Sequence, residues 1–279
     1  MVTVVFGARG NVGRYVADGL LAAGEQVRGT SRTPDVAGLP PRMKVVAADL
    51  ERPETLPAAL EGVDKVFLYT KPDGIEGFVE AAQAAGVRHV VLLSSGSVVA
   101  PGAEQNPIAR QHRTVEEALE RSGIAWTFIR PGMFATNTLW WWQRSIREQA
   151  VVRTPYPDAQ TAPIHEKDMA ALAVTALTEP GHRQRAYTMH GVESLTLRRQ
   201  VEQIGDAIGR SVRFEVISVE EARAEMGKTM PAIGVETFLR LWAACNGTPA
   251  QTSTIVEEIT GRPARTFAQW ARDHADDFR

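Results

Sequence analysis

The strongest constraint on the fold is an apolar run near the start of the chain that is followed at once by spaced glycines. Residues 2–6 read VTVVF, and Gly7, Gly10 and Gly13 follow at three-residue steps. Glycine allows a tight turn, a close backbone approach to a pyrophosphate, and close packing of a helix on a strand. We therefore predict a strand, a phosphate-binding turn and a helix, although a purely structural turn would use the same glycines. The predicted cofactor-binding residues of this turn are Gly7, Arg9, Gly10, Asn11, Val12 and Gly13.

Short β-branched runs alternate with amphipathic patterns over the first 130 residues. In the first amphipathic pattern, Val12, Val16 and Leu20 fall on one stripe at helical spacing. Apolar strands between amphipathic helices imply a parallel sheet that is covered on both faces. The expected strands are 2–6, 26–30, 43–47, 65–69, 89–94 and 126–130, and the expected helices are 11–23, 55–60, 74–85 and 108–122.

The alternation weakens after Pro131. We expect helices over 136–148 and 166–178, separated by a proline-rich loop at 153–163. Strands are expected over 186–189 and 212–217, with a helix between them that ends near Gly209. Only helices are expected beyond Val219. The predicted fold is α/β, a doubly wound parallel Rossmann sheet with a smaller, mostly C-terminal α/β lobe. The predicted domains are residues 1–154, which bind the cofactor, and residues 155–279, a substrate or partner lobe partly interleaved with the sheet.

Composition and charge exclude several other classes of protein. The chain has 279 residues, of which 44% are hydrophobic and 23% charged, as is typical of a globular protein. A net charge of −2 gives no general attraction to nucleic acid or anionic membranes. Cys245 is the single cysteine, so no disulfide can form within the chain. No apolar run reaches the ~18 residues that a membrane span requires. The N-terminus lacks a signal-peptide pattern. We expect a cytoplasmic monomer or homodimer that binds neither nucleic acid nor membrane, and the scattered histidines predict no metal site.

The end of the second expected strand favours NADP(H) over NAD(H). An NAD site usually places an acidic residue there to bind the ribose 2′-hydroxyl. This chain has Arg32 in that place, and Arg9 in the glycine turn can reach the same region. Two guanidinium groups can form charge-assisted contacts with a 2′-phosphate, although two solvated surface arginines are the alternative. After the third strand, Asp49 and Leu50 are candidates to bind the adenine amino group and flank its ring, and Asp49 could equally cap a helix.

Together these features resemble the atypical short-chain dehydrogenase/reductases, and within them the NmrA-like group. The matching strings are GARGNVG at 7–13, the basic Arg32, ADL at 48–50, LLSSGS at 92–97, HRTVEEALERSGIAWTFIRPGMF at 112–134, IHEKDMA at 164–170, YTMHGVESLT at 187–196 and IGRSVRFEVIS at 208–218. The resemblance covers nearly the whole chain. It implies a Rossmann sheet with a small C-terminal lobe, NADP(H) as the cofactor, and either a reductase activity or an NADP-sensing role without turnover.

The resemblance also shows where this chain departs from the wider superfamily. Its enzymes use a Tyr-x-x-x-Lys pair, in which the tyrosine donates a proton and the lysine holds the ribose and lowers the tyrosine pKa. Here Ile108 occupies the tyrosine position and His112 the lysine position, while Ser95 matches the serine that polarises the substrate. His112 and Ser95 are therefore the catalytic candidates. For His112 we favour a role in holding the cofactor over proton donation, and a solvated position on its helix is the third possibility.

By the same resemblance we expect Met133 and Phe134 to border the nicotinamide, and Pro131, Gly132 and Tyr69 are further cofactor-binding candidates. On the substrate side, the tryptophans at 140–142 lie on an expected helix, so at most two of them can line a cleft. Packing inside the molecule or in a dimer explains them equally well.

Two functions fit this pattern. The first is an NADPH-dependent reductase that transfers hydride to an apolar aromatic, quinone-like or conjugated small molecule, whose developing charge is delocalised and whose proton can come from solvent. The alternative is a non-catalytic NADP(H)-sensing regulatory protein, which the missing tyrosine and lysine support equally well.

Overall fold

A computed structural model describes residues 1–33, 39, 40 and 42–279. The chain folds into two compact units, and each unit draws on separate stretches of sequence. The first unit comprises Met1–Gly132, Glu166–Met189 and Ile255–Pro263, and the second comprises Met133–His165, His190–Thr254 and Ala264–Arg279.

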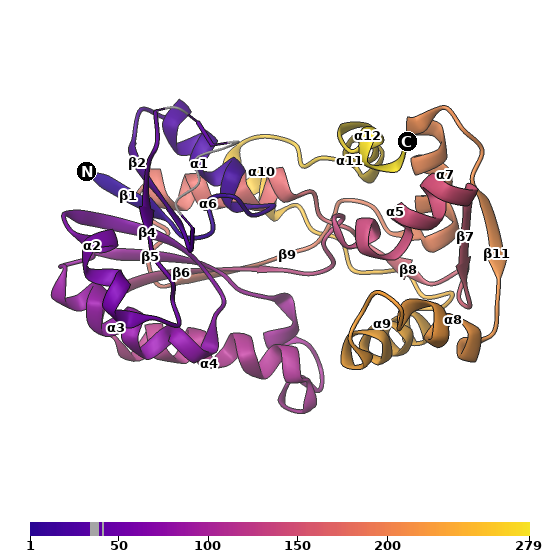
Figure 1. Cartoon of the computed structure of the whole chain (residues 1–279), viewed down its shortest axis with the longest axis horizontal. Coiled ribbons are helices and arrows are strands. Elements are labelled where there is room, and N and C mark those ends of the chain that lie inside the picture. The colour runs from indigo at the N-terminus through magenta and orange to yellow at the C-terminus, as the bar shows by residue number, and fades with distance from the viewer. Residues whose placement is uncertain (34–38, 41) are drawn as a thin grey trace. The chain divides into compact units, whose positions relative to one another are not determined.

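The first unit is built on a sheet of seven parallel strands (Figure 1). In sheet order they are β3 (Lys44–Ala47), β2 (Gln26–Ser31), β1 (Val2–Val5), β4 (Val63–Tyr69), β5 (His89–Leu93), β6 (Ala125–Pro131) and β9 (Arg185–Met189). The chain first adds strands outward from β1 to β3 and then outward from β4 to β9. The order therefore reverses between β1 and β4, and ligands of open α/β sheets bind outside the carboxyl ends of the strands at such a point.

Helices cover both faces of this sheet, as the alternating pattern predicts (Figure 1). One face carries α1 (Gly13–Ala22), α6 (Glu166–Thr178) and α10 (Ile255–Thr260), and the other carries α2 (Leu56–Leu60), α3 (Ile75–Ala84) and α4 (Pro107–Arg121). Short 3₁₀ turns occupy Pro53–Thr55, Pro72–Gly74, Gly96–Val99 and Ala103–Gln105. The predicted doubly wound α/β fold is confirmed.

Close packing holds the helices on the two faces of the sheet. On one face, the rings of Phe6 and Phe78 meet edge to face with their centroids 5.6 Å apart, inside a fully buried aliphatic core. On the other face, α1 lies so near α6 that a Cβ on Gly19 would come within 2.8 Å of Cγ2 of Val174. Interiors packed this densely leave little freedom to shift a helix along the sheet, so the loops at the strand ends are held firmly.

The second unit contains mostly helices with two small sheets. Its elements are α5 (Asn137–Gln149), β7 (Val151–Thr154), β8 (Gln160–Thr161), β10 (Leu195–Thr196), α7 (Leu197–Ile208), β11 (Arg213–Val216), α8 (Val219–Met226), α9 (Ala232–Ala244), α11 (Phe267–Asp273) and α12 (Ala275–Phe278). β7 pairs in parallel with β11, and β8 pairs antiparallel with β10. Trp142 is buried in the core of this unit while Trp140 is 68% exposed, so the consecutive tryptophans do point in different directions.

The sequence places every strand and α-helix of the first 130 residues, with ends that differ from the structure by no more than two residues. The loop expected at 153–163 is wrong in part, because it contains the end of β7 and all of β8. Both strands depend on pairing with residues far along the chain, which a local pattern cannot reveal. No helix in the described ranges is both long and apolar enough to cross a membrane.

Candidate active site

The glycine turn lies at the carboxyl end of β1, where the strand order reverses. Gly7 has a φ of +70°, a backbone conformation that favours glycine, and its carbonyl oxygen accepts the N–H of Gly10 at 2.8 Å. A Cβ on Gly13 would overlap that same carbonyl, so only glycine lets α1 begin this close to β1. The N-terminus of α1 thus lies at the end of the strand, and the positive end of a helix dipole favours phosphate binding at such a place. These residues fit the pyrophosphate of a dinucleotide.

The side chain of Tyr69, the last residue of β4, packs against the same turn. A Cβ on Gly7 would lie 3.1 Å from Cδ1 of the tyrosine ring. Burial raises the pKa of Tyr69, the Asp49 carboxylate raises it further, and the Arg32 guanidinium opposes the rise. Since these charges act on one phenol, the structure brings together three of the predicted cofactor-binding residues, which lie at the ends of β2, β3 and β4.

The remaining predicted residues of this half of the site have mixed surroundings. Arg9, Asn11 and Arg32 are exposed, as a contact with a charged ligand requires. One oxygen of Asp49 accepts the N–H of Glu51 at 3.1 Å, which is a local turn contact and not a helix cap, because the next two helices begin after Arg52 and Thr55. In this half of the predicted site the apolar side chains of Val12 and Leu50 are buried. Leu50 belongs to the apolar core, and its place beside an adenine stays a prediction.

His112 lies on the face of α4 that meets the sheet. Its Nδ1 is 2.8 Å from Oγ1 of Thr70, and this hydroxyl also donates to the carbonyl oxygen of Leu93 at 3.1 Å. Because a hydroxyl has only one proton to donate, we assign the imidazole proton to Nδ1, which leaves Nε2 as a hydrogen-bond acceptor. Burial lowers the pKa of His112 to about 4, although the Glu116 carboxylate acts against the shift. The imidazole is therefore neutral near pH 7 and is not a solvated surface residue.

Ser95 begins the turn that follows β5. Its Oγ accepts the N–H of Ser97 at 3.2 Å and lies 2.9 Å from the Ser97 hydroxyl. The next residue, Gly96, is so close to the end of β6 that a Cβ there would lie 3.2 Å from the carbonyl oxygen of Pro131. Pro131 is buried, and the N–H of Gly132 donates to the carbonyl oxygen of Met189 on β9. The ends of β5, β6 and β9 thus support Ser95, Pro131 and Gly132 together.

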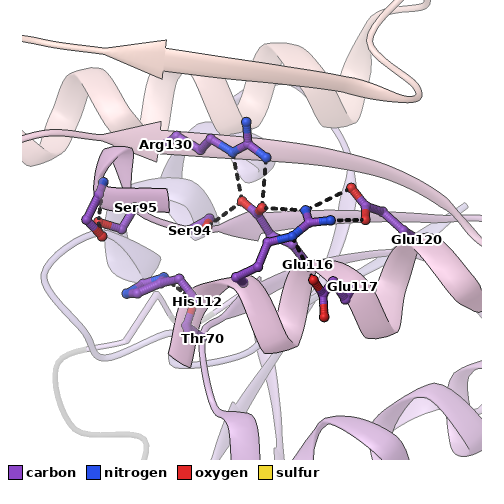
Figure 2. Close-up of polar contacts among 10 residues, drawn as sticks. Thr70, Ser94, Ser95, His112, Glu116, Glu117, Glu120 and Arg130 are labelled. Carbon is purple, nitrogen blue, oxygen red and sulfur yellow. Dashed lines mark hydrogen bonds and ion pairs between the residues drawn. The ribbon is translucent and has the colours of Figure 1, made fainter. Parts of the chain in front are cut away.

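Sequence reasoning missed the most heavily hydrogen-bonded group at these strand ends, the carboxylate of Glu116 (Figure 2). This side chain is fully buried and accepts hydrogen bonds from Oγ of Ser94 at 2.7 Å and from Nε and a terminal nitrogen of Arg130 at 2.8 and 2.7 Å. A guanidinium nitrogen of Arg113 adds a longer contact at 3.3 Å. The available signal was an arginine inside an otherwise apolar strand, together with a glutamate one helical turn after His112.

Two further positions named from the sequence are Ile108 and Phe134. Ile108, in the tyrosine position, is 40% exposed in the first turn of α4. Phe134 belongs to the second unit, where it forms a bridge to Ile164, and its place beside the nicotinamide stays a prediction.

Comparison with known proteins identifies the family. A model of NAD(P)H-binding proteins matches residues 7–180, which include the glycine turn, Tyr69, Ser95 and His112. The chain belongs to this NAD(P)H-binding family. The match confirms the predicted cofactor class on the Rossmann sheet.

Several relatives of this family member are reductases. The chain is 43% identical to a (4-alkanoyl-5-oxo-2,5-dihydrofuran-3-yl)methyl phosphate reductase of Streptomyces griseus, over 99% of this chain and 98% of the relative. It is 39% identical to an NAD(P)H azoreductase of Xenophilus azovorans, over 85% and 84% of the two chains. Among solved structures, an NADPH-dependent quinone oxidoreductase of Escherichia coli superimposes with a TM-score of 0.77 at 26% identity, over 98% and 99% of the chains. A more distant relative, 26% identical over 77% of this chain and 74% of its own, is an NmrA-like oxidoreductase of Aspergillus flavus. The predicted oxidoreductase class and the NmrA-like resemblance are confirmed.

The buried histidines predict an acid-sensitive fold. Burial lowers the pKa of both His89 and His112 to about 4, whereas an unfolded histidine titrates near 6.5. Unfolding between these values takes up a proton at each site, so stability is full above about pH 6.5 and falls as the pH drops toward 4. We expect the free energy of unfolding in urea to fall by ~1.4 kcal/mol per pH unit for each histidine in this window. In His112→Asn the part of this pH dependence that His112 contributes should disappear, so the free energy of unfolding should change less steeply with pH. An unchanged pH dependence would contradict the burial of His112.

The glycine turn predicts different defects at two neighbouring positions. Gly10→Val places a branched side chain where a phosphate approaches, while its Cβ crowds the Gly7 carbonyl only at 3.1 Å. We expect near-normal circular dichroism and a loss of NADPH affinity of at least about tenfold, since hydrogen bonds to a charged group are lost. Gly13→Ala, whose Cβ overlaps the Gly7 carbonyl, should lower the free energy of unfolding by roughly 1–3 kcal/mol as well. Normal NADPH binding by Gly10→Val would show that this turn is not the phosphate site.

Proposed function

We propose that the protein is an NADPH-dependent reductase that transfers hydride to an apolar quinone-like or conjugated acceptor. The observation that carries this proposal is the state of the two positions that usually supply the proton donor. Ile108 has no acidic proton, and the imidazole of His112 is neutral, with a pKa of about 4 and its one proton directed to Thr70. Neither of these two positions therefore supplies a strong acid to the substrate.

The residues at the strand ends fit the cofactor, and different residues would hold its different parts. The turn from Gly7 to Gly13 with the N-terminus of α1 would hold the pyrophosphate, and Arg9 and Arg32 would meet a 2′-phosphate. Nε2 of His112 would accept a hydrogen bond from a ribose hydroxyl, which replaces the donor that a lysine usually supplies there. When bound, the reduced nicotinamide supplies the hydride.

The acceptor class follows from where negative charge develops during the reaction. Hydride addition to an isolated carbonyl concentrates charge on one oxygen, which a nearby acid normally neutralises. In a quinone or conjugated enone the charge spreads over several atoms, so a hydrogen bond from a hydroxyl such as that of Ser95 and a proton from solvent suffice. The relatives support this class, because a quinone and a 5-oxo-2,5-dihydrofuran ring both contain conjugated double bonds.

Cofactor preference gives one test. Arg32→Ala should weaken NADPH binding by about one to two decades, because a charge-assisted contact with the 2′-phosphate is worth roughly 1.5–3 kcal/mol. Affinity for NADH, which lacks this phosphate, should hardly change. Isothermal titration calorimetry of both cofactors measures the difference. Equal losses for NADPH and NADH would remove Arg32 from the 2′-phosphate site.

Turnover with matched acceptors gives the second test. We expect saturable NADPH oxidation with naphthoquinone and with cyclohexenone, and a rate with cyclohexanone that is lower by at least about 10²-fold, since only the last lacks conjugation. The measurement is the loss of reduced-nicotinamide absorbance under steady-state conditions. Comparable rates with cyclohexenone and cyclohexanone would contradict the acceptor class. Tight NADPH binding without oxidation by any of these acceptors would instead favour an NADP(H)-binding regulatory protein.

A further inference from the structure

The buried carboxylate of Glu116 connects three segments that carry the proposed site. It belongs to α4, it accepts from Ser94 immediately after β5, and it accepts from Arg130 near the end of β6. We propose that Glu116 is a positioning residue, which fixes α4 against the sheet and so sets the place of His112 beside the cofactor. This inference rests on the cofactor role of His112 in the proposed function.

The hydrogen bonds of Glu116 hold its carboxylate in one position. Arg130 contacts both carboxylate oxygens, with Nε at 2.8 Å and a terminal nitrogen at 2.7 Å, in the bidentate geometry that fixes direction as well as distance. The Ser94 hydroxyl shares one oxygen with Arg130. Glu116 is fully buried and the Arg130 side chain is only 13% exposed, so solvent screens this ion pair little. Separating the two side chains would leave an uncompensated buried charge, so the pair holds α4 against β6.

The position of Glu116 also fixes the position of His112 on the same helix. Residues four apart on a helix lie on the same face one turn from each other, so His112 and Glu116 point to the sheet together. Figure 2 shows the two side chains on one side of α4. The Glu116 carboxylate is bonded to Ser94, and Thr70 links the His112 imidazole to the carbonyl of Leu93. The last residue of β5 and the residue after it thus anchor two consecutive turns of α4, and the next residue is Ser95.

The exposed glutamates of the same hydrogen-bond network provide a control variant. Arg113 joins Glu116 to Glu117 and Glu120, which are 47% and 32% exposed and contact no strand residue through this network. Glu120→Gln therefore makes the same chemical change as Glu116→Gln on the same helix but leaves the bonds to Ser94 and Arg130 in place. Exposed ion pairs of this kind add little to stability.

The experiment is a double-mutant cycle on NADPH affinity, measured by fluorescence titration of the full chain. We expect Glu116→Gln and His112→Ala each to weaken NADPH binding about tenfold, a typical cost of small displacements at a binding site. The double variant should bind no more weakly than His112→Ala alone, since Glu116 acts through that residue. Additive losses, or unchanged affinity in Glu116→Gln, would overturn the proposal. Glu120→Gln should bind as the wild type does.

A second measurement separates positioning from general loss of stability. The ¹⁵N resonances of the His112 imidazole report which ring nitrogen carries the proton, and they should move in Glu116→Gln but not in Glu120→Gln. If Glu116→Gln does not fold, Ser94→Ala removes a single hydrogen bond to the Glu116 carboxylate. This variant should show a smaller loss of NADPH affinity with the same dependence on His112. A Ser94→Ala variant with wild-type affinity and unmoved His112 resonances would also overturn the proposal. A wild-type chain that failed to bind NADPH would contradict the proposed function instead.

Discussion

The close approach of α1 to the end of β1 determines what this sheet edge can bind. The Gly7 carbonyl oxygen occupies the space that any side chain at position 13 would need, so the helix starts directly beneath the strand end. The Tyr69 ring packs against the turn from the end of β4, and the Arg32 guanidinium, which follows β2, acts electrostatically on the Tyr69 phenol. The turn, the aromatic ring and the guanidinium are the proposed phosphate site at the switch point of the sheet, and His112 and Ser95 of the proposed site belong to the same unit.

Most of this edge could be predicted from the sequence because its signals are local. Glycine spacing and alternating periodicity depend on residues within one or two turns of each other, so they place β1, α1 and the following strands correctly. The identity of position 32 likewise indicates a cofactor class without any knowledge of the fold. The family match over residues 7–180 agrees with that prediction at the level of NAD(P)H.

The part that sequence could not provide depends on burial and on long-range hydrogen bonds. Glu116, Glu117 and Glu120 look alike in the string EEALE, yet the first is fully buried and the others reach solvent. Thr70 and His112 are 42 residues apart, and their contact decides both the tautomer and the neutral state of the imidazole. An ordinary histidine titrating near 6.5 was the natural expectation from sequence, because nothing local signals that burial lowers its pKa.

The order in which strands enter the sheet also limits how the chain can be divided. β6 and β9 are neighbours in the sheet, but Met133–His165 of the second unit separates them in the chain. A fragment that stops before Arg185 would leave the hydrogen-bonding edge of β6 open, and open edges invite pairing with other chains. The cofactor sheet is therefore not a module that can be excised at the end of β6. During synthesis the ribosome must release residues well past the second unit's first segment before the sheet can add its last strand.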